Sequence, residues 1–211
     1  MYDSNERYPV IEEFSSVITS IHFSSDSKTI LSCSSDTAIR LWDVKSGNEI
    51  KVIYTKLENI TDAKFSFDGK TIAVCSINKI IELWDVESGV MIRQLIGHLN
   101  EVKAVVFSPD DSLIASCSSD CTIRIWEVKS GHQIKILNGH SDWVRDITFS
   151  WDGKTIISCS FDKTIRIWDV KSGSELQKLE GHIGDITGVD ISRDGMTIAS
   201  SSFDKTIRIW G

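Results

Sequence analysis

Histidine, serine and aspartate recur at fixed spacing in this chain, and together they are the residue types of a nucleophilic catalytic site. His98, Ser116 and Asp120 form one set, and the same set starts again at His140 and at His182. An enzyme that attacks with a serine hydroxyl needs one nucleophile beside one base in one cleft. Because this set occurs three times at identical offsets, it is typical of a buried hydrogen-bond network inside a repeated unit. We therefore expect a structural role for it, and we predict no catalytic residue.

The cysteines are arranged in the same regular way. Four of them stand 42 residues apart and so occupy one equivalent position in four separate units: Cys33, Cys75, Cys117 and Cys159. Equivalent positions of separate units do not pair, so we expect small, buried core residues there. No His or Cys cluster has metal-ligand spacing within a unit, and the chain has no Gly-rich phosphate loop. The sequence therefore predicts neither a metal nor a cofactor.

A tryptophan, followed in most copies by an acidic residue, marks the end of each unit. The dipeptides fall 42 residues apart, at Trp42-Asp43, Trp84-Asp85, Trp126-Glu127, Trp168-Asp169 and Trp210-Gly211. Self-similarity of this length means that each copy is a supersecondary unit that must stack on its neighbours to bury its apolar face. The chain is therefore expected to hold five copies of one unit.

Within a unit, apolar residues alternate with polar ones. In the fourth copy, this pattern predicts strands near residues 144–149, 155–158, 164–168 and 175–179. Turn residues separate the strands, for example Ser-Trp-Asp-Gly at 150–153. Four short strands joined by three tight turns indicate one antiparallel sheet per unit.

A Gly-His pair, a turn Asp and a Trp-Asp pair in this order resemble the WD40 repeat family, and the resemblance covers essentially the whole chain. It implies an all-β protein, a β-propeller built from five four-stranded antiparallel blades around a channel. We expect an N-terminal arm at residues 1–6 and a single propeller domain at 7–211. The repeats are placed at about 7–42, 43–84, 85–126, 127–168 and 169–211.

The resemblance also assigns a structural tetrad of His, Ser, Asp and Trp to each repeat. Three repeats carry it in full: His98, Ser116, Asp120, Trp126; His140, Ser158, Asp162, Trp168; and His182, Ser200, Asp204, Trp210. The first repeat has Phe14 in the His place. The second has Lys56, Val74 and Asn78, and matches only at Trp84. We expect packing to hold these two blades.

The ends of the chain complement each other in this scheme. Residues 7–12 align with the outer strand 91–96, and residues 206–210 form a third strand, so the two ends would share one blade in a closed ring. Propellers of this family usually have seven blades, whereas this chain holds five. Three states remain open: a closed five-blade ring, an open ring, or a fragment of a longer array.

Composition narrows the classes of partner. A net charge of −7 argues against broad binding to nucleic acid or to anionic lipid. No apolar run approaches the roughly 20 residues of a membrane span, and residues 1–14 do not resemble a signal peptide. We therefore expect a cytoplasmic or nuclear protein whose partners are proteins or peptides, with an unknown oligomeric state.

Binding residues are expected at the mouth of the channel, where members of the family often meet their partners. The resemblance singles out three positions in each repeat: Val17, Thr19, Ser35; Asn59, Thr61, Ile77; Glu101, Lys103, Ser119; Trp143, Arg145, Phe161; and Asp185, Thr187, Phe203. We expect the partner to contact Glu101, Lys103, Trp143, Arg145, Phe161, Asp185, Thr187 and Phe203. The aromatic residues and Arg145 are of the types that dominate interface hot spots. The competing interpretation is that the aromatic rings only cover turns and a sheet edge. Trp151, in a hairpin on the opposite face, is expected to be exposed without a binding role.

The sequence thus favours a non-catalytic protein-interaction scaffold. The alternative is a sensor or regulatory propeller that belongs to a larger multidomain protein, and an enzyme is the third hypothesis.

Overall fold

The described strands form five sheets, which we number as blades one to five. The computed structural model describes residues 10–11 and 16–211 of the chain, and this part is all β-strand, turn and loop. Blade one contains β1 (Ile18–Phe23), β2 (Thr29–Ser34), β3 (Ala38–Asp43) and β4 (Glu49–Tyr54). Blade two contains β5 (Ile60–Phe65), β6 (Thr71–Ser76), β7 (Ile80–Asp85) and β8 (Met91–Ile96). Blade three contains β9 (Val102–Phe107), β10 (Leu113–Ser118), β11 (Thr122–Glu127) and β12 (Gln133–Asn138). Blade four contains β13 (Val144–Phe149), β14 (Thr155–Ser160), β15 (Thr164–Asp169) and β16 (Glu175–Glu180). Blade five contains β17 (Ile186–Ile191), β18 (Ile198–Ser202) and β19 (Ile207–Trp210).

Each blade is an antiparallel meander in which consecutive strands pair. The register repeats from blade to blade: Trp168 of the third strand lies opposite Ile156 of the second, and Trp126 lies opposite Ile114 in the same way. The turns between the first two strands are closed by residues with left-handed backbone, such as Gly153 at φ 68°. The predicted strands of the repeat are therefore confirmed, with boundaries that differ by one or two residues.

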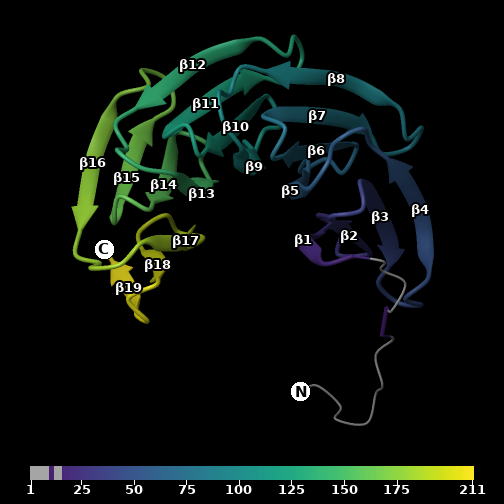
Figure 1. Cartoon of the computed structure of the whole chain (residues 1–211), viewed down its shortest axis with the longest axis horizontal. Helices are drawn as coiled ribbons and strands as arrows, with labels where there is room; N and C mark the ends of the chain where they lie inside the picture. Colours follow the sequence, from purple (N-terminus) through teal and green to yellow (C-terminus); the bar gives the residue numbers. More distant parts are fainter. Residues whose placement is uncertain (1–9, 12–15) are drawn as a thin grey trace.

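The five blades stand side by side in an arc, with the first strand of each blade innermost and its last described strand outermost (Figure 1). We call the space that the arc encloses the channel. Strands β1 and β17 face each other across a gap in this arc. The described part of the chain is thus an incomplete ring, which was one of the states left open by the sequence.

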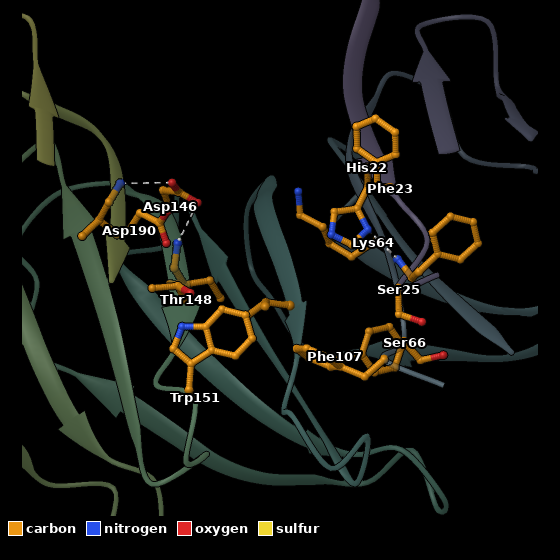
Figure 2. A pocket seen from close by; sticks show the side chains of 15 residues that line it. His22, Phe23, Ser25, Lys64, Ser66, Phe107, Asp146, Thr148, Trp151 and Asp190 are labelled. Carbon is orange, nitrogen blue, oxygen red and sulfur yellow. Dashed lines mark hydrogen bonds between the residues drawn. The ribbon is translucent and has the colours of Figure 1, made fainter. Parts of the chain in front are cut away.

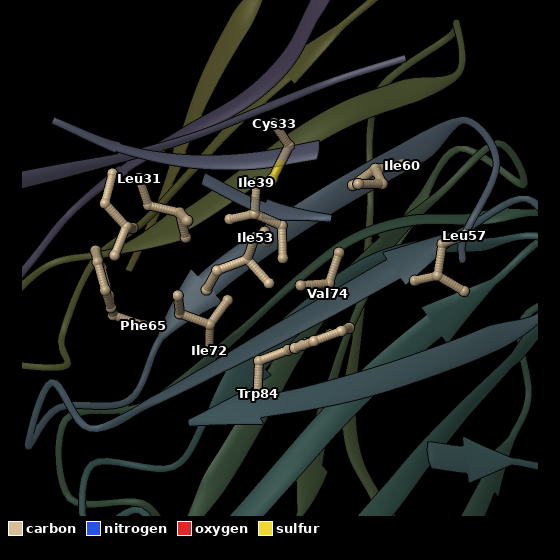
Figure 3. Close-up of a cluster of buried hydrophobic side chains, with 12 residues drawn as sticks. Leu31, Cys33, Ile39, Ile53, Leu57, Ile60, Phe65, Ile72, Val74 and Trp84 are labelled. Carbon is tan, nitrogen blue, oxygen red and sulfur yellow. The ribbon is translucent and has the colours of Figure 1, made fainter. Parts of the chain in front are cut away.

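The core lies between neighbouring blades. Each of four apolar clusters combines residues of two successive blades. In the cluster of Figure 3, Leu31 and Ile39 from blade one pack against Phe65, Ile72 and Trp84 from blade two. The free cysteines Cys33, Cys75, Cys117 and Cys159 are all buried in these clusters. A blade therefore gains its apolar burial from its neighbours.

The two ends of the arc expose residues that every inner blade buries. Ile207 on β19 is 76% exposed, whereas Ile165 at the same repeat position is 0% exposed. At the other end, Phe23 on β1 is 54% exposed and its counterpart Phe65 only 5%. The sequence is nearly the same at these positions, so the difference follows from the lack of a neighbouring blade at each end among the described residues.

The expected sharing of one blade by both ends falls largely outside the described residues. Blade five has three strands in the described part of the chain. Residues 7–9 and 12, which were expected to add its fourth strand, lie outside that part, as does Phe14. None of the described residues belongs to a helix that is long and apolar enough to cross a membrane.

The open ends predict a difference between two matched variants. Ile165→Ala should lower the free energy of unfolding by about 2–5 kcal/mol, because it removes methyl groups from a packed interior. Ile207→Ala, the same change at the same repeat position, should cost no more than about 0.5 kcal/mol, because that side chain is already in water. Urea titration of both variants measures the difference. Equal losses would mean that the end face is covered in solution and would contradict the open arc.

Candidate functional site

The His, Ser, Asp and Trp residues of blades three, four and five form one hydrogen-bonded chain in each blade. In blade four, Nδ1 of His140 lies 2.8 Å from Oδ2 of Asp162, and Nε2 lies 2.8 Å from Oγ of Ser158. The indole Nε1 of Trp168 donates to the same hydroxyl at 2.9 Å. The ionised carboxylate of Asp162 can only accept, so Nδ1 of His140 donates to it. Blades three and five repeat this geometry.

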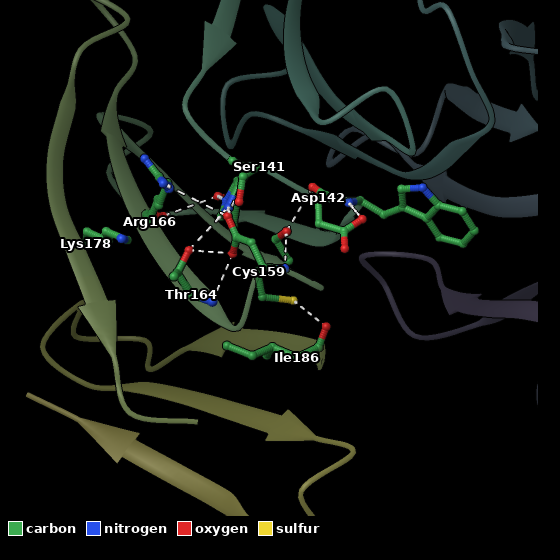
Figure 4. Close-up of polar contacts among 12 residues, drawn as sticks. Ser141, Asp142, Cys159, Thr164, Arg166, Lys178 and Ile186 are labelled. Carbon is green, nitrogen blue, oxygen red and sulfur yellow. Dashed lines mark hydrogen bonds and ion pairs between the residues drawn. The ribbon is translucent and has the colours of Figure 1, made fainter. Parts of the chain in front are cut away.

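These sets are closed to a substrate. Ser158 is fully buried, and its oxygen is already engaged by the indole and the imidazole. Figure 4 shows the surrounding contacts of blade four, in which Thr164 donates to Asp162 and the Cys159 thiol reaches the Ile186 carbonyl oxygen of blade five. The network therefore ties strands and blades together and presents no free nucleophile.

In blade three, burial and hydrogen bonding determine the charge states of His98 and Asp120. Burial lowers the pKa of the His98 imidazole below its ordinary value, against the opposing pull of Asp120. Burial would raise the pKa of Asp120, but hydrogen bonds from His98, from Thr122 and from the Leu99 N–H hold that pKa well below its usual range. A neutral imidazole beside an ionised carboxylate follows from these two shifts.

Blade two, which we expected to be held mainly by packing, has a different buried bond in the place of the missing tetrad. The indole Nε1 of Trp84 donates to Oε2 of Glu82 at 3.1 Å, and Gln94 donates to the other carboxylate oxygen at 3.0 Å. Glu82 is 1% exposed and occupies the position that is arginine in the other four blades. In blade one, Trp42 still donates to Ser32, at 2.7 Å.

A row of three aromatic side chains, two exposed and one half-buried, lies at the end of the channel where the inner strands begin. The rings of Trp143 and Phe161 are stacked with centroids 5.7 Å apart, and the Phe161 and Phe203 centroids are 6.0 Å apart. Trp143 is 42% exposed and Phe203 66% exposed. The N–H of Phe161 donates to the Trp143 carbonyl oxygen at 2.9 Å, which fixes the two turns relative to each other. The structure therefore brings together three aromatic residues from two blades. We call these three residues, with Lys103 and Arg145, the channel-mouth face.

Two cations of the channel-mouth face differ in their partners. Nζ of Lys103 lies 5.1 Å from the centre of a Trp143 ring and also pairs with Glu101. Arg145 is exposed, and no hydrogen bond or ion pair joins its side chain to another described residue. Both cations line a hollow of about 420 Å³. Arg145 is thus the cation of this face that is left available to a partner.

Thr187 and Asp185, which were also predicted to contact the partner, are less accessible at the end of the channel. Thr187 is half-buried and its hydroxyl lies 3.1 Å from that of Ser201, within its own blade. Asp185 is half-buried, and its carbonyl oxygen accepts from the Phe203 N–H at 2.9 Å. Thr19, Asn59 and Thr61, which the resemblance places at the corresponding positions of the first two repeats, form a polar wall of the hollow.

No group of three or more His, Cys, Asp or Glu side chains among the described residues is arranged to hold a metal ion.

Five successive segments of the chain match the family model described as WD domain, G-beta repeat: residues 9–43, 47–85, 89–127, 131–169 and 173–211. No curated protein matches the chain.

The first prediction from this geometry concerns His140. His140→Ala should lower the free energy of unfolding by about 1–3 kcal/mol, because it leaves Asp162 and Ser158 without a buried partner. The matched control is Lys56→Ala, at the same repeat position of blade two, which should cost at most about 0.5 kcal/mol because Lys56 is exposed. Thermal and urea unfolding give both values. A loss of equal size in the two variants would argue against the network.

The second prediction concerns acid. The pKa of Asp120 is lower in the folded chain than the unfolded value of about 4, so its stabilisation is complete above about pH 4 and is lost as pH falls further. The free energy of unfolding of Asp120→Asn should therefore fall less steeply below pH 4 than that of the parent chain. Glu127→Gln, a change at an exposed carboxylate of the same blade, should keep the parent slope. Identical slopes for all three proteins would rule out this role of Asp120.

Proposed function

Because the chain belongs to the WD40 repeat family, we propose that it is a non-catalytic scaffold that docks a protein or peptide partner on the channel-mouth face. Propellers of this family generally serve as protein-interaction scaffolds. The observation that carries the proposal is the row of Trp143, Phe161 and Phe203, in which Trp143 and Phe203 are exposed and Phe161 is half-buried between them. Rows of stacked aromatic rings remove large apolar area from water on binding and lose few rotamers, so they concentrate binding energy.

The chemistry of the face indicates what a partner would offer. An apolar or aromatic side chain of the partner would lie on the row, in which Trp143 stacks on Phe161 and Phe203 packs against Phe161 at a tilt. The free Arg145 would receive a carboxylate or a backbone carbonyl oxygen, since its planar guanidinium can donate two parallel hydrogen bonds. Lys103 contributes less charge because Glu101 already pairs with it. We therefore propose a partner segment that combines an apolar anchor with an acidic or carbonyl-rich flank.

The inner wall of the hollow makes this face asymmetric. Blades one and two present small polar and aliphatic residues to the hollow, among them Thr19, Asn59 and Ile77. The aromatic rings of blades four and five lie on the channel-mouth face but outside the lining of the hollow. Burial of apolar area contributes about 25 cal/mol per Å², so most of the affinity should come from the aromatic side. We infer that blades four and five anchor the partner and that blades one and two complete the rim.

Trp143→Ala and Arg145→Ala test the proposal. A partner is first captured with the intact chain, identified and purified, and its dissociation constant is then measured by calorimetry. Each variant should weaken binding by roughly 30-fold or more, equivalent to about 2 kcal/mol, because each removes a hot-spot side chain. Circular dichroism confirms that the variants remain folded.

The matched control is Trp151→Ala, which makes the same change as Trp143→Ala at the opposite end of the channel. It should leave the affinity for this partner unchanged. Full binding by the Trp143 and Arg145 double variant would refute the site, and a loss confined to Trp151→Ala would move it to the other end.

A further inference from the structure

The channel has a second cavity, at the end where the inner strands finish. It measures about 640 Å³ and is lined by residues of all five blades, from Phe23 in blade one to Asp190 in blade five. This volume lies within the range of roughly 300–1,000 Å³ that is typical of ligand sites. We call it the far-end cavity. None of the residues of the channel-mouth face lines it.

An aromatic corner forms one part of the far-end cavity. Trp151 and Phe67 lie edge to face with ring centroids 6.4 Å apart, and they are 49% and 42% exposed. Phe107 lies near Trp151 at the base of the cavity (Figure 2). The Asp111 carboxylate accepts from the backbone N–H groups of Phe67 and Asp68 at 2.7 and 2.8 Å, which fixes the turn that carries Phe67. The corner is therefore held in position before any ligand arrives.

The charged groups stand on two opposite walls. Figure 2 shows Asp146, Asp190 and Trp151 on one side of the cavity and His22 and Lys64 on the other. The positive wall is already neutralised. Lys64 pairs with Asp62 at 3.4 Å, and burial lowers the pKa of His22 to about 4, so His22 is neutral near pH 7.

The acidic wall is not neutralised in this way. Asp146 accepts from the backbone N–H groups of Ile147 and Val189 at 2.9 and 3.2 Å, and Asp190 accepts from that of Ile191 at 2.8 Å. No ion pair joins either carboxylate to a described residue. Burial raises the pKa of Asp146 to about 6, so its carboxylate is charged at neutral pH but poorly solvated. The cavity as a whole therefore favours a positive ligand.

A cation of the chain itself also lies near the Trp151 indole. The guanidinium of Arg193, from the turn between β17 and β18, lies 5.8 Å from the centre of a Trp151 ring. Arg193 does not line the cavity, and no ion pair among the described residues joins it to Asp146 or Asp190.

From this geometry we propose that the far-end cavity binds an arginine or lysine side chain of a peptide segment. The cationic group would lie between Asp146 and Asp190, and its aliphatic stem would run along Trp151 and Phe67. Side chains of this kind bury their methylene groups against apolar surface while the charge meets a carboxylate. The net charge of −7 on the chain adds a weak general attraction for such a segment.

The experiment uses the whole chain and two synthetic probes. One is the pentapeptide acetyl-Ala-Leu-Arg-Leu-Ala-amide, and the other has citrulline in place of the arginine, which keeps the shape and removes the charge. Calorimetry measures both affinities. The arginine peptide should bind at least about tenfold more tightly than the citrulline peptide, because only the first meets the carboxylates as a cation.

Single-residue variants test whether the arginine peptide binds in the far-end cavity. Asp190→Asn keeps the acceptor for the Ile191 N–H, so it should fold normally and weaken binding of the arginine peptide by about tenfold or more. Trp151→Ala should weaken it to a similar degree. Two controls should leave it unchanged: Glu87→Gln, which removes one exposed carboxylate on the outside of blade two, and Trp143→Ala at the channel-mouth face.

Equal affinity of the two peptides, no measurable binding of the arginine peptide, or full binding by Asp190→Asn would each overturn the proposal. Loss of binding in Trp143→Ala with full binding in Trp151→Ala would also overturn it, because the probe would then sit at the other end of the channel. None of these results depends on whether the channel-mouth face docks a protein partner.

Discussion

The structure depends on the packing of one blade against the next. A four-stranded sheet has two faces, and a single blade of this chain carries apolar residues on both. Each of the four clusters is therefore assembled from two blades, as Leu31 and Ile39 show where they meet Phe65 and Trp84. The hydrogen-bonded sets of His, Ser, Asp and Trp act within this frame, since they hold the strand ends and turns at the positions that the packing requires. Both ends of the channel are shaped by the same stacking, because the first strand of every blade lies on the inner side of the arc (Figure 1).

The repeat length and the alternation of apolar residues were enough to predict the strands and their pairing. They could not predict how many neighbours a blade has. Ile165 and Ile207 stand in the same local sequence, Thr-Ile-Arg-Ile-Trp, yet one is buried and the other is in water. Burial of this isoleucine depends on whether another blade packs against it, and the local sequence does not contain that information. The bond between Trp84 and Glu82 escaped prediction for a related reason, because its residues replace the usual ones with side chains of a different kind.

The candidate sites also differ in how much of them the repeat pattern could predict. Trp143, Phe161 and Phe203 occupy equivalent or adjacent turn positions, so their closeness follows from the repeat, and the structure adds the stacking distances. The far-end cavity could not be found in this way, because its lining comes from all five blades and its charge depends on which groups are already paired. One signal was present: Asp62 and Asp146 stand at the same repeat position. Each reaches a backbone N–H of the next blade at 3.2 Å, Val105 and Val189 respectively.

The open arc also has a consequence for the order in which the chain loses structure. A stack of like units is stabilised by nearest-neighbour contacts, so an inner unit gains from two contacts and a terminal unit from one. Blades one and five are terminal units of this kind. Local opening should then begin at the ends and spread inward, with backbone amides of blade three the last to exchange with solvent. Phe203 belongs to a terminal blade and Trp143 to an inner one, so the aromatic row spans a gradient of rigidity. A ligand that contacts both residues would stabilise blade five against local opening. Through the nearest-neighbour contacts it would also stabilise the other blades.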